Sequence, residues 1–324
     1  MATQNTDTTN NPVNNAINNA GPSPGPREAH PSAGGDLYQI VTDKIIALIE
    51  QGIARDGKPQ WLGQGGAAGM PYNYSTGKQY SGVNVLMLWI EADTCRLGSS
   101  AWLTFKQARV LGGNVRKGEK GAHIVYFEPL KREEINRTTG EKSEKIIPML
   151  RQYVVFNMDQ IEGITPVAAQ AGGFVGIEAA EAVLTHSAAP IIEGGTKAYY
   201  SPNHDEIHLP DRVRFDRSET FYAIALHELT HSTGHKSRLA RDFSKRFGDE
   251  AYAFEELVAE LGAAFACADL GLIPTTMDDH ASYIEHWLRV LKQDKRAIFT
   301  AASQASKAHD YIVNFAAREE RAAA

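Results

Sequence analysis

Apolar residues recur every three to four positions in several stretches of the chain, and this spacing predicts its helices. Three of these stretches lie in the first half of the chain: residues 37–55, 81–90 and 105–111. Five more lie in the second half: residues 177–184, 221–229, 252–265, 280–292 and 295–317. Eight helices are therefore expected.

Shorter stretches rich in β-branched and aromatic residues predict strands. Residues 123–127 and 152–157 stand out in the first half, and a charged hairpin from Lys131 to Lys145 is expected between them. In the second half, residues 198–201 and 206–209 are expected to pair just ahead of the next helix. Helices and strands in both halves predict the α+β class.

Shifts in composition mark the boundaries between the predicted parts. Residues 1–36 consist mostly of Asn, Thr, Pro, Gly and Ala, and they bury too little apolar surface to order themselves, so we expect a disordered tail. Residues 163–174 are small and uncharged, as is typical of a linker. The sequence therefore predicts two domains, residues 37–162 and residues 175–324.

Charge is distributed unevenly between these domains. The whole chain has a formal net charge of −6. Residues 37–160 hold 16 Lys and Arg against 12 Asp and Glu, whereas residues 161–324 hold 16 against 24. Only the first domain is therefore a candidate for binding an anionic partner such as nucleic acid.

Composition also narrows the cellular setting and the kinds of site. No apolar run approaches the length of a membrane span, and the polar N-terminus has no hydrophobic stretch that would serve as a secretory signal. We therefore expect a cytoplasmic protein without a membrane partner. The two cysteines, Cys95 and Cys267, are far apart and indicate neither a disulfide framework nor a cysteine zinc site.

The sequence His227-Glu-Leu-Thr-His231 lies on one of the predicted helices and has the spacing of a metal site. Two histidines four residues apart face the same way on a helix, so both imidazoles can reach one cation. Zn²⁺ takes such ligands and leaves a position for water, whose proton an adjacent carboxylate can accept. Glu228 is expected to be that general base, although a helical histidine is more often an ordinary core or surface residue.

A third ligand is expected from a second helix. The extended motif that ends in a third histidine would need it at position 237, which is Ser237, and His235 lies about 12 Å along the helix axis from His227. Glu256 and Glu260 lie four apart on the otherwise apolar helix 252–265, where carboxylates are costly to bury without a partner. We predict Glu256 as the ligand and Glu260 as the carboxylate that orients a histidine.

Glu255 is expected to be a solvated neighbour of this pair. The alternative for Glu256 and Glu260 is that they form surface ion pairs and bind no metal.

Basic and aromatic side chains are interleaved in the first domain, which is typical of proteins that hold single-stranded nucleic acid. Cations contact phosphates, and aromatic rings stack on bases. The candidate residues are Lys78, Tyr80, Trp102, Lys106, Gln107, Arg116, Lys117 and Lys120. The alternative is that Trp102 and Phe105 belong to an ordinary core and that the lysines form a solvated face.

Taken together, the two halves resemble the ArdC-like antirestriction proteins of conjugative plasmids, over nearly all of residues 37–317. In the first domain the motifs that carry the resemblance are Tyr80-Ser-Gly-Val-Asn84, Trp102-Leu-Thr-Phe-Lys-Gln107, Gly113 to Gly121 and Val155 to Gln160. In the second they are Tyr200 to Pro210, the His227 motif, Arg238-Leu and Tyr252 to Phe265.

The resemblance implies a domain that binds single-stranded DNA, followed by a zincin-like metallopeptidase domain. It also implies protection of incoming plasmid DNA against the recipient's restriction enzymes. Asn84 joins the expected DNA-binding residues through its motif.

Three functions remain open at this point. The first is a zinc-dependent peptidase, with manganese as the alternative ion and a host protein as substrate, joined to a domain that binds single-stranded DNA. The second is a DNA-binding protein whose metal site is structural or vestigial. The third is a metal-dependent nuclease, which a site for a single cation favours less than a peptidase.

Overall fold

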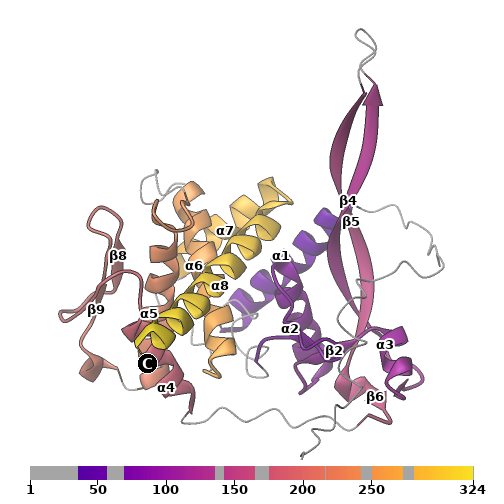
Figure 1. Cartoon of the computed structure of the whole chain (residues 1–324), viewed down its shortest axis with the longest axis horizontal. Coiled ribbons are helices and arrows are strands. Elements are labelled where there is room, and N and C mark those ends of the chain that lie inside the picture. The colour runs from indigo at the N-terminus through magenta and orange to yellow at the C-terminus, as the bar shows by residue number, and fades with distance from the viewer. Residues whose placement is uncertain are drawn as a thin grey trace, which may run out of the picture. The chain divides into compact units, whose positions relative to one another are not determined.

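A computed structural model describes residues 36–56, 69–135, 142–164, 175–215, 217–241, 250–272 and 281–323. The predicted tail, apart from residue 36, and residues 165–174 of the predicted linker lie outside this part of the chain. Figure 1 shows the arrangement of helices and strands.

Within its described residues, the first half contains three helices and six strands, most of the strands short. The helices are α1 (Leu37–Asp56), α2 (Val83–Cys95) and α3 (Phe105–Val110), as expected from the apolar spacing. The strands are β1 (Tyr72–Asn73), β2 (Ala101–Leu103), β3 (Asn114–Val115), β4 (Ala122–Ile135), β5 (Lys142–Asn157) and β6 (Ile161–Glu162). A 3₁₀ turn, Met158–Gln160, connects the last two.

Strands β4 and β5 form a long antiparallel ribbon that extends past the short strands beside it (Figure 1). The four-stranded sheet has the order β1, β2, β5, β4, so β4 is an edge strand. The ribbon is paired from Ala122 opposite Val155 as far as Ile135 opposite Lys142. The two strands therefore extend into the charged segment from Lys131 to Lys145, which was expected to connect them. Because strand pairing uses backbone groups, a run of charges does not prevent it.

The second half is built from five helices and a small sheet. The helices are α4 (Val175–Thr185), α5 (Ser218–Thr233), α6 (Glu250–Asp269), α7 (Ala281–Gln293) and α8 (Ala297–Ala323). The strands are β7 (Ile191–Glu193), β8 (Tyr199–Ser201) and β9 (Glu206–Leu209), followed by a 3₁₀ turn at Arg212–Arg214. The predicted pair β8 and β9 is antiparallel, and β7 adds to β9 in parallel.

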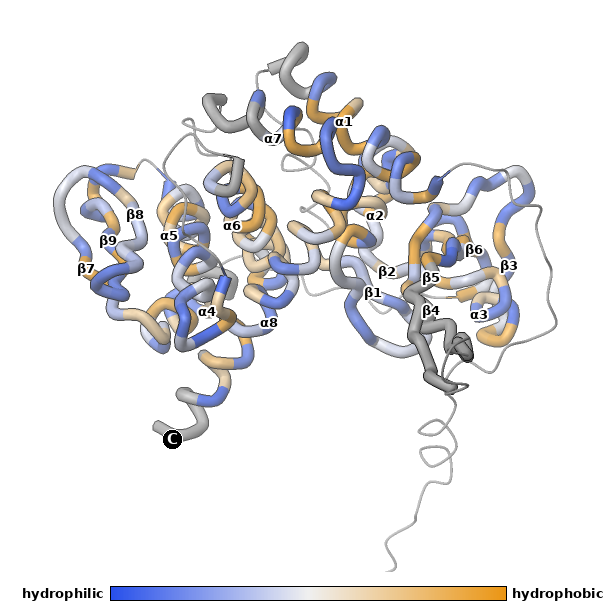
Figure 2. Tube along the Cα trace, turned by 90° about the horizontal axis from the view of Figure 1, so that it is seen from above, coloured by the Kyte–Doolittle hydropathy of each residue, from blue (hydrophilic) through white to orange (hydrophobic). Residues whose placement is uncertain are grey.

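Helix α6 contributes to both of the larger apolar clusters. One cluster joins α6 to α1, α2, α7 and α8 through side chains that include Ile45, Trp89, Phe265 and Trp287. The other joins α6 to α4, α5, α8 and the small sheet. Apolar colouring runs along α2 and α6 in Figure 2. A helix that is buried on all sides needs polar partners for any charge it carries.

Hydrogen bonds accompany this apolar contact between the halves, among them one from Lys292 to the Glu50 carboxylate (2.7 Å). The Thr42 hydroxyl donates to the carbonyl of Lys295 (2.8 Å), and the backbone N–H of Gly82 donates to the Ser306 hydroxyl (2.8 Å). The Gln79 amide donates to the Asp269 carboxylate (2.6 Å) at the end of α6. Residues Asp36–Ala324 thus form a single compact unit that contains both domains.

Candidate metal centre and nucleic-acid interface

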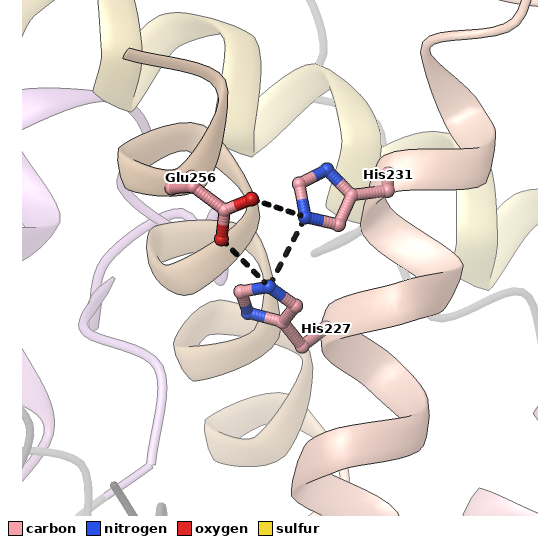
Figure 3. A group of neighbouring side chains, drawn as sticks. All are labelled: His227, His231 and Glu256. Carbon is pink, nitrogen blue, oxygen red and sulfur yellow. Dashed lines mark hydrogen bonds and ion pairs between the residues drawn. The ribbon is translucent and has the colours of Figure 1, made fainter. Parts of the chain in front are cut away.

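Two histidines of α5 and a glutamate of α6 point toward one another (Figure 3). The Nε2 atoms of His227 and His231 are 3.1 Å apart. One carboxylate oxygen of Glu256 lies 3.4 Å from Nε2 of His227, and the other lies 3.5 Å from Nε2 of His231. The predicted spacing on α5 and the predicted third residue on α6 therefore meet at one point.

The separations among these atoms fit a shared cation. Zinc ligands about 2.0–2.2 Å from a tetrahedral centre are about 3.3–3.6 Å from one another. The two Nε2 atoms are slightly closer than that, at 3.1 Å, and they lie 3.4 and 3.5 Å from different oxygens of Glu256. All three side chains are largely buried, with side-chain exposures of 4, 12 and 9% for His227, His231 and Glu256. The residues present fit a divalent ion held by two imidazoles and a carboxylate.

A close helix contact sets this geometry. A Cβ atom added to Gly262 of α6 would lie 2.5 Å from Cγ2 of Thr230 on α5. Real Cβ atoms do not approach other atoms so closely, so α6 can lie against α5 at this point because residue 262 is glycine. The ligands of the two helices lie within two turns of the contact.

Each histidine has its second ring nitrogen beside a further carboxylate. Glu260 lies 3.5 Å from Nδ1 of His227, in the position predicted for the residue that orients a histidine. Glu255 lies 3.2 Å from Nδ1 of His231. Carboxylates in this position fix the tautomer and orientation of metal-binding imidazoles.

The expectation that Glu255 is solvated was wrong. The residue is buried, with 6% exposure, and its carboxylate accepts hydrogen bonds from Arg241 at 2.8 and 3.0 Å. Arg241 also donates to the carbonyl of Thr230 and the hydroxyl of Thr233 at the end of α5 (both 2.7 Å). Sequence reasoning missed both residues of this pair.

The carboxylates dominate the electrostatics of the site. Burial lowers the pKa of His227, but hydrogen bonds to Glu256 and Glu260 outweigh it and raise this pKa to about 10. Burial likewise lowers the pKa of His231, while Glu255 and Glu256 raise it to about 9. Burial raises the pKa of Glu256, but both imidazoles lower it well below its ordinary value. The pocket therefore favours positive charge.

Glu228 follows the first histidine on α5 and is buried, with 6% exposure. Its charge contributes to the raised pKa of His227. Glu228 remains the residue predicted as the general base.

The segment that follows α5 is held against the β8–β9 hairpin. Arg238 donates to the Asp205 carboxylate (3.0 Å) and to the carbonyl of Ser232 (2.7 Å). The Tyr200 hydroxyl donates to the same aspartate (2.8 Å). His235 lies 3.6 Å from Asp205 and is not among the converging ligands, as its spacing predicted.

The residues predicted to bind DNA do not converge in this way. Lys78, Lys106, Arg116, Lys117 and Lys120 are exposed. The Arg116 guanidinium is paired with Glu119 at 2.8 Å. Gln160, which is 3% exposed, donates to Glu119 (3.0 Å) and to the carbonyl of Lys120 (2.9 Å), so a buried amide holds the basic loop in place.

The other predicted DNA-binding residues pack in an apolar cluster or form hydrogen bonds within the domain. Trp102 is 1% exposed within an apolar cluster, so the alternative of an ordinary core residue describes it. Tyr80 is half-buried against the same cluster. Gln107 completes a capping box with Thr104 at the start of α3, and Asn84 bonds the backbone of Val125. The Trp102 ring is therefore closed to stacking, and the Tyr80 ring is only partly exposed.

Within the described residues, none of the helices is both long and apolar enough to cross a membrane.

Two domain families match the chain in succession. Residues 35–156 match the N-terminal domain of the anti-restriction factor ArdC, and residues 178–304 match the zincin-like metallopeptidase family. Protein y4eC of Sinorhizobium fredii is 39% identical over 289 residues, which cover 87% of this chain and 93% of y4eC. The DNA primase TraC of Escherichia coli is 36% identical over 292 residues, which are 86% of this chain but 27% of TraC.

Two solved structures are similar over most of the chain. The metal-free crystal structure of the antirestriction protein ArdC from plasmid R388 has a TM-score of 0.73 and 45% identity, with 88% of this chain and 99% of that chain covered. Its Mn(II)-bound structure has a TM-score of 0.72 and 43% identity, with 87% of this chain and 99% of that chain covered. The chain therefore belongs to the ArdC-like antirestriction family and joins an ArdC-type N-terminal domain to a zincin-like metallopeptidase domain.

Proposed function

We propose that this protein hydrolyses peptide bonds at a zinc site and binds single-stranded DNA, and that it protects incoming plasmid DNA from host restriction during conjugation. The observation that carries the peptidase proposal is the convergence of His227, His231 and Glu256 within 4.8 Å, with the buried residue Glu228 directly after His227 in the sequence. Such a donor set is typical of metallopeptidases, which place one general base next to the ligands.

The roles of the residues follow from their positions. A divalent cation bound there would polarise the peptide carbonyl and lower the pKa of water. Glu228 would accept a proton from the attacking water and pass it to the leaving amine. Glu255 and Glu260 would hold the two imidazoles in the tautomer that presents Nε2 to the cation.

An extended peptide could bind along the β8 edge of the small sheet. Strand β8 pairs with β9 on one side only, and it packs against α5. Main-chain groups of an edge strand can pair with an added strand. The hydrogen bond from Arg238 to Asp205, in the turn between β8 and β9, would keep that edge in place. We propose a host protein as the source of the peptide.

Zinc is the ion that this donor set favours, since two imidazoles and a carboxylate with tetrahedral spacing are its usual ligands. Manganese is the alternative, because an R388 ArdC structure is Mn(II)-bound. Metal analysis of protein purified without added ions, followed by competition between the two ions, would decide between them.

The proposal of DNA binding draws on two observations. The residues between 37 and 160 have four more basic than acidic groups, and the chain is similar to DNA primases. Electrostatic attraction of this kind favours phosphate backbones.

The test of the peptidase is Glu228→Gln in the full-length protein. We expect the variant to keep its metal content and its DNA affinity but to lose cleavage of a fluorogenic peptide library. Cleavage at the parent's rate would refute the role of Glu228. Glu219→Gln, at the partly exposed start of α5, is the matched control and should cleave normally.

A second candidate function is a DNA-binding protein whose metal site only stabilises the fold. The buried pairing among Glu255, Arg241 and His231 favours it, because the same contacts tie α5 to the segment that follows it and to α6. The discriminating measurement is protection of plasmid DNA from restriction by Glu228→Gln. Protection equal to the parent's would support this candidate, and lost protection would support the peptidase.

A further inference from the structure

Two tyrosines of the β4–β5 ribbon have rings that are open to solvent. Tyr126 is 59% exposed and Tyr153 is 45% exposed. Their ring centroids are 6.5 Å apart, and the ring planes are inclined by 78°. Rings at this inclination cannot both stack on one flat partner, so each is available to a different one.

A basic residue, Arg151, shares the face of the ribbon that holds the two rings. Tyr126 is opposite Arg151 in the register, and Tyr153 follows two residues later on β5. Because side chains two apart on a strand share a face, Arg151 is next to both tyrosines. Arg151 is exposed.

Basic residues outnumber acidic ones around this face in the sequence. Residues 120–128 and 150–158 contain Lys120, His123 and Arg151 against one acidic residue, Glu128. The charge of this part of the ribbon therefore matches that of a polyanion. A protein partner would match it only through acidic side chains.

Asn84 binds the backbone of the ribbon next to Tyr126. Its side-chain amide donates to the carbonyl of Val125 (2.8 Å), and its side-chain oxygen accepts from the N–H of the same residue (2.8 Å). The Val125 side chain is buried, with 6% exposure, so the next residue along the strand points outward. A ring held in this way loses little further freedom when it binds a flat ligand.

We propose that Tyr126, Arg151 and Tyr153 form the base-stacking part of a site for single-stranded DNA. This inference rests on the proposed DNA binding and replaces Trp102 and Tyr80, whose rings are buried or half-buried, as the stacking residues. Tyrosine rings stack on bases, and the guanidinium contacts a phosphate between them. Asn84 is a positioning residue for this site.

The test uses full-length protein and fluorescence anisotropy with a labelled oligo-dT of about 20 nucleotides, longer than a typical binding site. Tyr126→Ala and Tyr153→Ala should each weaken binding by about fivefold or more, the loss expected for one stacked base. Tyr126→Phe and Tyr153→Phe should bind like the parent. Arg151→Gln should reduce the salt slope by about 0.7.

An oligonucleotide of abasic sites separates stacking from a change in fold. The parent should prefer oligo-dT to this probe, and the double alanine variant should bind both equally. Tyr199→Ala is the control, because that tyrosine is 46% exposed on β8 in the other domain. Thermal unfolding of each variant should match the parent.

The outcomes distinguish the two proposals. If the parent binds oligo-dT and the double alanine variant keeps both its affinity and its preference for bases, this inference is overturned and the DNA contacts lie elsewhere. If the parent does not bind oligo-dT at all, the proposed DNA binding is refuted, and the inference is refuted with it.

Discussion

The candidate metal centre and the β4–β5 ribbon place their side chains in opposite environments. At the candidate metal centre, charged groups are buried between α5 and α6, and every predicted ligand has a partner within 3.5 Å. On the ribbon, large side chains such as Tyr126 stand in solvent. Loss of one member of a buried charge pair leaves the other uncompensated, whereas loss of an exposed contact costs only that contact. Substitutions should therefore have large effects at the centre and small ones on the ribbon.

Arg241→Ala should have the largest effect. It removes the cation that pairs with buried Glu255, so we expect the free energy of unfolding to fall by about 3–5 kcal/mol. Chemical denaturation measures the free energy of unfolding. Arg217→Ala is the control, because that arginine is exposed and its pair with Glu219 is 3.8 Å long, so a change within about 0.5 kcal/mol is expected. A loss below about 1 kcal/mol for Arg241→Ala would contradict the contrast between buried and exposed sites.

His309→Gln tests the same contrast away from the metal. Burial lowers the pKa of His309, but Asp269 and Asp310 outweigh it and raise this pKa to about 9. The folded state thus holds a proton that the unfolded state releases above about pH 6.5. The histidine's contribution, at most about 3 kcal/mol, is fully present below pH 6.5 and is lost as the pH rises through 9.

The measurement is the difference in unfolding free energy between parent and variant across that pH range. It should shrink steadily from pH 6.5 to 9. His123→Gln, at an exposed position, should show no such trend. A constant difference for His309→Gln would mean that its ring carries no extra proton in the folded state.

Glu260→Gln should weaken metal binding by about 10- to 100-fold, the usual cost of losing a carboxylate behind a ligating histidine. Chelator competition on purified protein gives the affinity. The control variant Glu219→Gln, at a partly exposed position, should bind the metal as the parent does. Equal affinities for parent and Glu260→Gln would show that His227 is oriented by other contacts.

Lys106→Ala should have the smallest effect. An exposed lysine contributes one phosphate contact, so we expect a loss of a few-fold in affinity for single-stranded DNA and a salt slope reduced by about 0.7. Anisotropy titrations at several salt concentrations measure both. A slope identical to the parent's would place Lys106 away from the phosphates.

Helical periodicity made the convergence of His227, His231 and Glu256 predictable. His227 and His231 share a face because they are four apart, and the same spacing brings Glu256 and Glu260 together. Glu255 was assigned wrongly because α6 was taken to have a solvent side. Residues 257–268 hold no charge except Glu260, and this pattern indicates burial all round.

The first domain was less predictable because its signals were compositional. Trp102 lies in a three-residue strand, too short for any alternation to show its buried face. Thr104 and Gln107 do have the spacing of a capping box, and that signal would have identified Gln107 as structural. Asn84 bonds a strand 41 residues away, and nothing local in the sequence encodes such a contact.

Because α6 supplies side chains to both apolar clusters, the two domains cannot be studied as independent fragments. Cutting the chain between them would strip Phe265 and Trp287 of the α1 and α2 side chains that cover them. The freed surface would promote aggregation, and a fragment lacking DNA affinity or metal would be uninformative. Assigning each activity to its residues therefore calls for point substitutions in the intact polypeptide.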